Sequence, residues 1–332
     1  MKRFTMLKAV LCTLCLVMAL SCSENKMNNA TPEPISLNNN KIKVTNGVLV
    51  FSSQQEFDNA LQVLTNKGTK SFNEWEALFT GFTSMRTAYD QITEQDIAKI
   101  GETKSLQGFE NYVTFLEING EREAIRVIAS DAMATLFNKD GIVIIGEDAY
   151  KYKFEKILKV LKPTTADMIT LASFDCKNLQ SSVDELVLVR QVKGQTLSVK
   201  NGRPGGITND YCISQYGGNR RLVGESNVTR TIGGGTFNSI TCQAKHQRRL
   251  FGIWWAEAIP RIRLRMTSYL RNGDGFGSSG NVVLNPNGGE RFNENIVSVD
   301  VPGCPCYGTI AYTADGDTGD GYKECSESES AY

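Results

Sequence analysis

Apolar and polar residues alternate along the first folded stretch of the chain, from Lys41 to Phe51, with Asn46-Gly47 in the middle. A period of two residues is typical of a strand that buries one face. Asn-Gly tolerates the positive φ angles of a tight turn between two strands. The pattern therefore predicts a β-hairpin at the start of the folded chain.

After the hairpin, apolar residues recur every three or four positions, which is the spacing of an amphipathic helix. Three residue pairs have the spacing of a capping box, the hydrogen-bonding motif of a helix N-terminus: Ser53 with Glu56, Ser71 with Glu74, and Thr93 with Asp96. We therefore predict three helices, each beginning at one of these pairs.

The pattern is mixed from there to residue 200. Helical spacing favours a helix over 124–137, the apolar run 142–145 predicts a buried strand, and alternation over 150–154 predicts a returning strand. A further strand is predicted within ELVLVRQV (185–192). Residues 41–200 are therefore predicted to form a small α+β unit.

Glycine and proline crowd NGRPGGITN (201–209), which predicts a domain boundary there. From residue 205 to 332 the chain is rich in glycine and shows short alternating segments rather than helical spacing. The clearest segment alternates apolar Ile262, Leu264 and Met266 with basic Arg261, Arg263 and Arg265. The predicted fold class is α+β: an α+β N-terminal unit followed by a disulfide-stapled all-β, sandwich-like C-terminal domain.

The first 40 residues have the layout of an export signal and a tether. Basic residues precede a short apolar run (9–20), and Ser21-Cys22 follows it. That run is shorter than the roughly 20 residues needed to span a bilayer. A cysteine at the cleavage position is typical of a bacterial lipoprotein, so residues 1–21 are predicted to be removed and Cys22 to be lipidated, for example with palmitate. Residues 22–40 are then a polar tether, and we expect an outer-membrane anchor, with the periplasmic or surface side left open.

Composition agrees with an exported globular protein. The chain has 332 residues, 41% of them hydrophobic, and a formal net charge of zero, so no bulk attraction to nucleic acid is expected. Of its nine cysteines, two lie in the signal and one is Cys22. An even number remains, which in an exported chain predicts disulfides without fixing their pairing: Cys176, Cys212, Cys242, Cys304, Cys306 and Cys325.

Three segments of the N-terminal half together resemble a known group of proteins. They are GVLVFSSQQEFDNAL, the helix segment NEWEALF, and LFNKDGIVIIGEDAYKY. This combination, over about residues 44–155, is similar to the N-terminal half of uncharacterised lipoproteins from Bacteroidetes. The resemblance implies export and an outer-membrane location, and it implies no catalytic residue.

The sequence contains no recognisable catalytic motif. His246 is the only histidine and lies between Lys245, Arg248 and Arg249, so we expect it to be an exposed strand or loop residue rather than a catalytic base. No cofactor is expected. Asp315, Asp317 and Asp320 lie close together but depart from the EF-hand pattern, which leaves an irregular calcium site as an alternative to a solvated turn.

Charge is unevenly distributed after residue 220. Basic residues dominate 220–271 and acidic residues dominate 272–332. Arginine presents planar donors suited to sulfate, phosphate or carboxylate groups. The candidate anion-binding residues are Arg261, Arg263, Arg265, Arg248, Arg249 and Trp254. The competing interpretation is that the basic strands pair with the acidic segment of the same domain.

Three hypotheses for function follow. The first is an envelope lipoprotein that binds an anionic glycan, another envelope polymer or a protein through this arginine face. The second is a structural or accessory envelope protein with a protein partner and no small ligand. The third is a glycan-active hydrolase, which would need two carboxylates close together in space.

Overall fold

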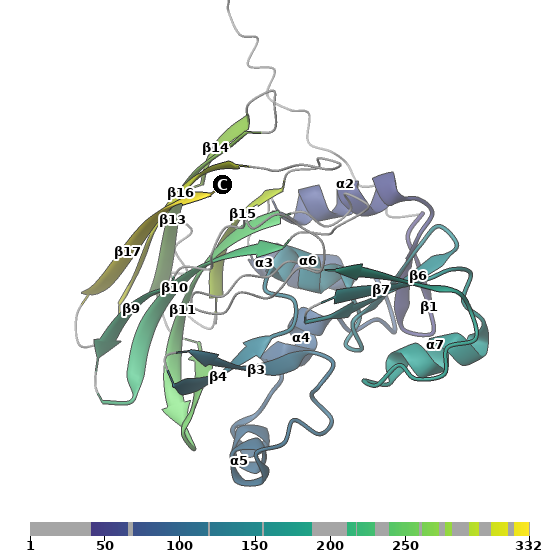
Figure 1. Cartoon of the computed structure of the whole chain (residues 1–332), viewed down its shortest axis with the longest axis horizontal. Helices are drawn as coiled ribbons and strands as arrows, with labels where there is room; N and C mark the ends of the chain where they lie inside the picture. The colour runs from purple at the N-terminus through teal and green to yellow at the C-terminus, as the bar shows by residue number, and fades with distance from the viewer. Residues whose placement is uncertain are drawn as a thin grey trace, which may run out of the picture. The chain divides into compact units, whose positions relative to one another are not determined.

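The computed structural model describes residues 41–331, with gaps at 66–68, 119, 155, 188–210, 217, 230–238, 259–260, 272–275, 281–291, 299–306 and 318–321. In the strands after residue 260, and in 65, 69–71, 118, 186–187, 211–212, 226–229 and 239–242, it describes the backbone alone. All described residues belong to one compact unit, Leu37–Tyr332. Helices and mixed β-sheets confirm the predicted α+β class (Figure 1).

The first sheet has six strands in the order β1-β2-β5-β6-β7-β8. Their bounds are β1 (Lys43–Thr45), β2 (Val48–Phe51), β5 (Ile142–Ile145), β6 (Asp148–Lys153), β7 (Lys156–Val160) and β8 (Val183–Val187). The predicted first hairpin is confirmed, and Asn46 and Gly47 have φ angles of 50° and 74°, as its turn requires. Strands β2 and β5 pair in parallel, and the other neighbours are antiparallel.

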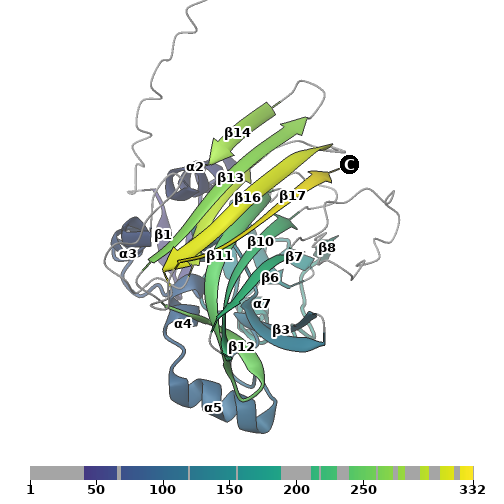
Figure 2. The same cartoon turned by 90° about the vertical axis from the view of Figure 1, so that its left-hand side faces the viewer.

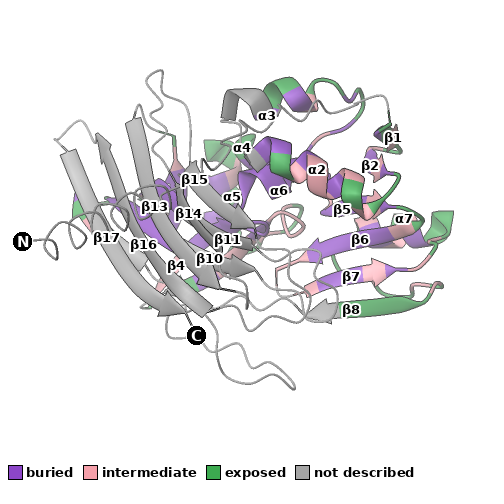
Figure 3. Ribbon diagram, turned by 90° about the horizontal axis from the view of Figure 1, so that it is seen from above, coloured by how far each residue is buried: buried purple, intermediate pink, exposed green. Residues whose placement is uncertain are grey.

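Helices cover both faces of this sheet. The described helices are α2 (Gln54–Thr65), α3 (Thr69–Glu76), α4 (Met85–Asp90), α5 (Glu94–Thr103), α6 (Asp131–Leu136) and α7 (Thr165–Ala172). Helix α5 does not pack on this sheet, since its Ile97 and Ile100 share a core with Ile253 and Trp255. On one face, residues of α2, α3 and α6 share a core with Tyr150 and Tyr152 of β6. On the other face, Leu171 of α7 packs with Ala149 and Val160. Strand β6 is consequently buried over most of its length (Figure 3).

The second sheet joins segments that are far apart in the sequence. Its order is β3-β4-β12-β11-β10-β9, with β15 also paired to β11. The bounds are β3 (Val113–Ile118), β4 (Glu121–Arg126), β9 (Tyr211–Tyr216), β10 (Arg220–Thr229), β11 (Ser239–Leu250), β12 (Ile253–Glu257) and β15 (Phe292–Ser298). Strand β12 runs parallel to β4. Strands from both sides of the expected boundary at 201–209 therefore share one sheet.

The third sheet has four antiparallel strands in the order β14-β13-β16-β17 (Figure 2). The bounds are β13 (Arg261–Arg271), β14 (Phe276–Gly280), β16 (Tyr307–Asp317) and β17 (Tyr322–Ala331). The predicted strand around Arg261 is thus confirmed as β13. The backbones of β13, β16 and β17 approach those of β9, β10 and β11 in the second sheet.

Several local predictions need correction. The helix expected over 124–137 is wrong in its first half, which is the end of β4. The helix there begins only at Asp131, because the Ser130 side chain accepts a hydrogen bond from the Met133 N–H and caps it. Ser53 Oγ accepts from the Glu56 N–H at 3.3 Å, as predicted for the start of α2, but the Glu56 carboxylate accepts from the Ser52 N–H at 2.6 Å rather than from Ser53. Helix α3 begins at Thr69, before Ser71, whereas the Thr93–Asp96 capping box is confirmed.

Candidate functional site

A cavity of about 300 Å³ lies where the first sheet meets the β3–β4 hairpin. Residues of β6, β7 and β3 line it, together with the segment that leads into β3 and Phe174, which follows α7. Cavities that hold small ligands have volumes of about 300 Å³ and upward. This cavity, which we call the lysine pocket because Lys151, Lys153 and Lys156 all line it, is therefore large enough for a small organic molecule.

Lys151 is the most unusual residue of the lysine pocket. It lies in the middle of β6 and is 1% exposed. Its ammonium donates a hydrogen bond to Asn111 Oδ1 at 2.7 Å and another to the Asp140 backbone oxygen. Asn111 is itself held by a hydrogen bond from its Nδ2 to the Ala172 carbonyl at 3.0 Å. Two segments, the one that leads into β3 and the turn before β5, therefore hold the Lys151 nitrogen in place.

Burial changes the acidity of this lysine. Removal from water disfavours the charged form and lowers the pKa of Lys151 to about 8, while Cys176 and Asp140 oppose this effect in part. A lysine with such a pKa exists partly as a free amine near neutral pH. A strongly perturbed group in a cavity is a physical indicator of a functional site.

The other charged groups of the pocket are already held in place. Lys153 Nζ lies 5.0 Å from the centre of the Phe174 ring. Lys156 Nζ pairs with Glu185 Oε2 at 2.9 Å, and Glu110 Oε2 accepts from the Gly108 N–H at 2.7 Å. With Lys156 neutralised by Glu185, Lys151 and Lys153 against Glu110 leave the pocket a small excess of positive charge. Its walls also include apolar side chains, so the geometry suits an organic anion with an apolar part.

A second group of charged residues is buried between β4 and the neighbouring strands. We call Glu121, Glu123, Arg221, Glu225 and Lys245 the buried charge cluster. Lys245 Nζ lies 2.5 Å from Glu123 Oε1 and 2.9 Å from Glu225 Oε2. Arg221 pairs with Glu123 at 3.1 Å and with Glu121 at 2.9 Å. These ion pairs connect β4 to β10 and β11 and therefore fasten the hairpin to the second sheet.

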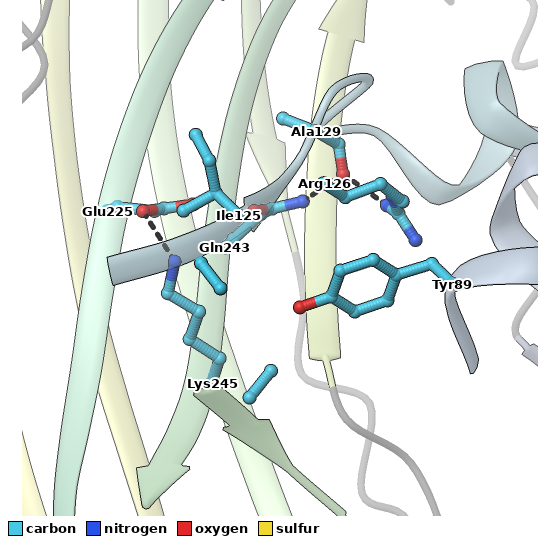
Figure 4. A pocket seen from close by; sticks show the side chains of 9 residues that line it. Tyr89, Ile125, Arg126, Ala129, Glu225, Gln243 and Lys245 are labelled. Atoms are coloured by element: carbon cyan, nitrogen blue, oxygen red, sulfur yellow. Dashed lines mark hydrogen bonds and ion pairs between the residues drawn. The ribbon is translucent and has the colours of Figure 1, made fainter. Parts of the chain in front are cut away.

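The cluster has three carboxylates against two cations, and Arg249 supplies a third cation by pairing with Glu121 at its edge. Burial lowers the pKa of Lys245, but the adjacent carboxylates of Glu123 and Glu225 outweigh burial, so the net pKa is raised and the side chain is charged. A cavity of about 10 Å³ adjoins Lys245, Glu225, Gln243, Arg126 and Tyr89 (Figure 4). That volume is at the lower limit for one water molecule. The cluster is thus a structural ion network with no room for an organic ligand.

The described part of the predicted arginine face is engaged within the chain. Trp254 is only 2% exposed, its indole N–H donates to Glu121 at 3.0 Å, and the Arg221 guanidinium lies 4.1 Å from its ring. Arg249 pairs with Glu121 at 3.4 Å, and Arg248 pairs with Glu94. Trp254 is therefore a buried anchor and does not offer a stacking surface for sugars.

The side chains of Arg261, Arg263 and Arg265 lie outside the described residues. The backbone register of β13 and β16 pairs Arg261 with Asp317 and Arg263 with Asp315. Residues at paired positions of antiparallel strands lie on the same face of a sheet. The register therefore favours the interpretation in which the basic strand is matched by the acidic segment of the same domain.

Two other predictions about single residues change. His246 is fully buried, not exposed, and its Nδ1 lies 2.5 Å from the Tyr216 hydroxyl. The thiol of Cys176 is free, so the structure does not support a disulfide there. The side chains of Cys212, Cys242 and Cys325 and all of Cys304 and Cys306 lie outside the described residues, as do Cys22 and the tether.

Within the described ranges, no group of three or more His, Cys, Asp or Glu side chains is placed to hold a metal ion. Of the acidic residues weighed for calcium, Asp320 and the side chains of Asp315 and Asp317 fall outside these ranges. No helix in the described part of the chain is long and apolar enough to cross a membrane.

Comparison with known proteins gives little further information. No model of a protein family matches the sequence, and no curated protein matches it. Among solved structures, one match is a DUF4848 family protein from Bacteroides thetaiotaomicron, with 13% identity and a TM-score of 0.30 over 87% of this chain and all of that one. A likeness this distant establishes neither a shared fold nor a shared function.

The lysine pocket was not predicted from the sequence. One signal was present: Lys151 and Lys153 alternate with Tyr150 and Tyr152 in a strand next to the apolar run 142–145. In an amphipathic strand the lysines usually point into solvent. In β6 they do not, because α7 covers the face of the sheet that carries Ala149. The pocket can be predicted only if α7 is predicted first. The Thr164–Asp167 capping box is the sequence signal for the start of that helix.

Proposed function

We propose that the protein is an exported lipoprotein, anchored in the outer membrane through Cys22, that binds a small organic anion in the lysine pocket. The signal-like N-terminus and the polar tether support the anchor. This proposal keeps the binding role and the anionic ligand that the sequence predicted. It differs in the location of the site, which lies in the N-terminal half and not on the arginine face. The described arginines are already paired with glutamates, which weakens the arginine face as a site.

The observation that carries this proposal is the burial of Lys151 beside a cavity. A buried ammonium is costly unless nearby groups compensate it. Asn111 and Asp140 each supply a hydrogen-bond acceptor, but neither contributes a carboxylate in contact with Lys151 Nζ. An anionic ligand would supply the missing negative charge, and its carboxylate, phosphate or sulfate group would also lie near Lys153 and Lys156.

Binding can be tested by calorimetry with 4-methylbenzoate, a probe that joins a carboxylate to an apolar ring. The full chain, purified in detergent, is compared with Lys151→Met and with Lys43→Met, a matched change of an exposed lysine on β1. We expect the unaltered protein and Lys43→Met to bind alike, and Lys151→Met to bind at least about tenfold more weakly, because one contact to a charged group contributes about 1.5–3 kcal/mol. Equal affinity of all three proteins would refute the proposed site.

We also propose the finer architecture of the C-terminal half. The approach of β13, β16 and β17 to β9, β10 and β11 supports a sandwich of two sheets. Cysteine content in an exported chain supports disulfides among Cys212, Cys242, Cys304, Cys306 and Cys325. Cys176, whose thiol is free, is not included among them.

A further inference from the structure

The hydrogen bonds of Lys151 fix more than its position. An uncharged amine has two N–H bonds and one lone pair, arranged roughly as a tetrahedron with the carbon stem. Asn111 Oδ1 and the Asp140 carbonyl accept two hydrogen bonds from this nitrogen. When the nitrogen is uncharged, both of its N–H bonds are used, and the lone pair occupies the remaining direction. Lys151 lines the cavity, and a ligand there would have to reach the nitrogen from that direction.

We propose that the lysine pocket captures organic anions that carry an aldehyde or ketone, and that Lys151 Nζ bonds covalently to their carbonyl carbon. This inference rests on the proposed binding function and narrows its ligand class. Lys153 and Lys156 would hold the anionic group, and the apolar walls would exclude part of the water that competes for the carbonyl. Oxo acids and open-chain sugar acids have this combination of groups.

The reaction needs no oxidant or cofactor. The lone pair of Lys151 Nζ attacks the carbonyl carbon, the C=O π electrons move to oxygen, and that oxygen takes a proton while the nitrogen loses one. The carbinolamine hydroxyl then takes a proton and leaves as water, the nitrogen lone pair forms the C=N bond, and the nitrogen releases its second hydrogen as a proton to give the imine. One water leaves for each ligand bound, and water entering the pocket reverses the reaction.

Acid–base properties support a reactive amine at this position. At pH 7 a pKa of about 8 leaves roughly a tenth of Lys151 uncharged, compared with a few molecules in ten thousand of an ordinary lysine. Desolvated lysines in apolar pockets are the usual amine nucleophiles of proteins. Exposed lysines such as Lys43 do not share this environment and provide an internal reference.

The test uses 4-carboxybenzaldehyde, which replaces the methyl group of 4-methylbenzoate by an aldehyde. The full chain in detergent is incubated with this probe and sodium cyanoborohydride, which reduces an imine to a stable amine, and labelled peptides are mapped by mass spectrometry. We expect Lys151 to be labelled at least about tenfold faster than Lys43 at pH 7, because a larger fraction of its amine is uncharged. Lys151→Arg keeps the positive charge but lacks the amine, so it should bind 4-methylbenzoate and lose the adduct.

The outcomes separate the two proposals. Binding of 4-methylbenzoate without faster labelling of Lys151 would overturn covalent capture and leave the anion site intact. Absence of both binding and labelling would overturn both proposals. Fast labelling of Lys151 that 4-methylbenzoate suppresses by competition would support both, because the two probes would then occupy the same cavity.

Discussion

Replacement of Lys151 by methionine should change how the stability of the protein depends on pH. Methionine has a similar length and no charge, so it fills the space of the stem and removes the ionisable group. In the folded protein the pKa of Lys151 is lowered from 10.5 to about 8, mainly because the side chain is buried. The unfolded chain exposes this lysine, whose pKa then returns to its ordinary value near 10.5.

The size of the effect follows from the two pKa values. Below pH 8 the lysine is protonated in both states, and its burial lowers the free energy of unfolding by about 3 kcal/mol relative to an uncharged amine. Between pH 8 and pH 10.5 the folded state has released the proton and the unfolded state still binds it. The unfolded state then binds more protons, so the free energy of unfolding rises with pH. From pH 7 to pH 10 this contribution amounts to about 2–3 kcal/mol.

The assay is urea unfolding of the unaltered protein and of Lys151→Met at several values between pH 7 and pH 10. Other titrating groups, including Tyr112 and Tyr150, whose pKa values are raised by burial, act equally in both proteins and cancel in the difference. We expect the unaltered protein to gain about 2–3 kcal/mol relative to Lys151→Met as the pH rises. Parallel stability curves would refute the reasoning, because they would mean that Lys151 titrates alike in the folded and unfolded chains.

Three further predictions concern other parts of the chain. Glu123→Gln should lower the free energy of unfolding, measured by urea titration, by about 3 kcal/mol, because Lys245 and Arg221 each lose a buried carboxylate partner. The control, Glu117→Gln, removes an exposed ion pair and should lower it by less than about 1 kcal/mol. Gly101→Ala in α5, a change that usually stabilises a helix, should lower the melting temperature because its new Cβ would collide with the Cβ and ring of Phe251. A second change, Phe251→Gly, removes both clashing groups at a position whose φ is 53° and should restore the melting temperature. Cys22→Ser should abolish incorporation of labelled palmitate, while Cys15→Ser within the signal should leave it unchanged; labelling of Cys22→Ser would disprove the anchor.

Local signals in the sequence predicted the elements whose geometry depends on neighbouring residues. Asn46-Gly47 specified the first turn, the Thr93–Asp96 box specified the start of α5, and the run 142–145 specified β5. The helix expected over 124–137 failed because β4 is stabilised by partners far away in the chain: β3 on one side and β12 on the other. Tertiary pairing overrides helical spacing in such a segment, and no local pattern reveals the partner.

Charge patterning misled the prediction of the site for a related reason. Clustering of basic residues along 220–271 indicated an external anion, but a sequence does not show which acids lie near them in space. Described members of that cluster meet Glu94, Glu121 and Glu123 of the N-terminal half. For Lys151 the sequence gives too little signal, because a single lysine between two tyrosines does not indicate a local excess of charge. Its significance comes from α7 and the β3–β4 hairpin, which remove it from water without placing a carboxylate in contact with its nitrogen. A buried cation without a carboxylate in contact is thus a stronger indicator of a ligand than a surface rich in arginine, because the fold compensates its charge only in part.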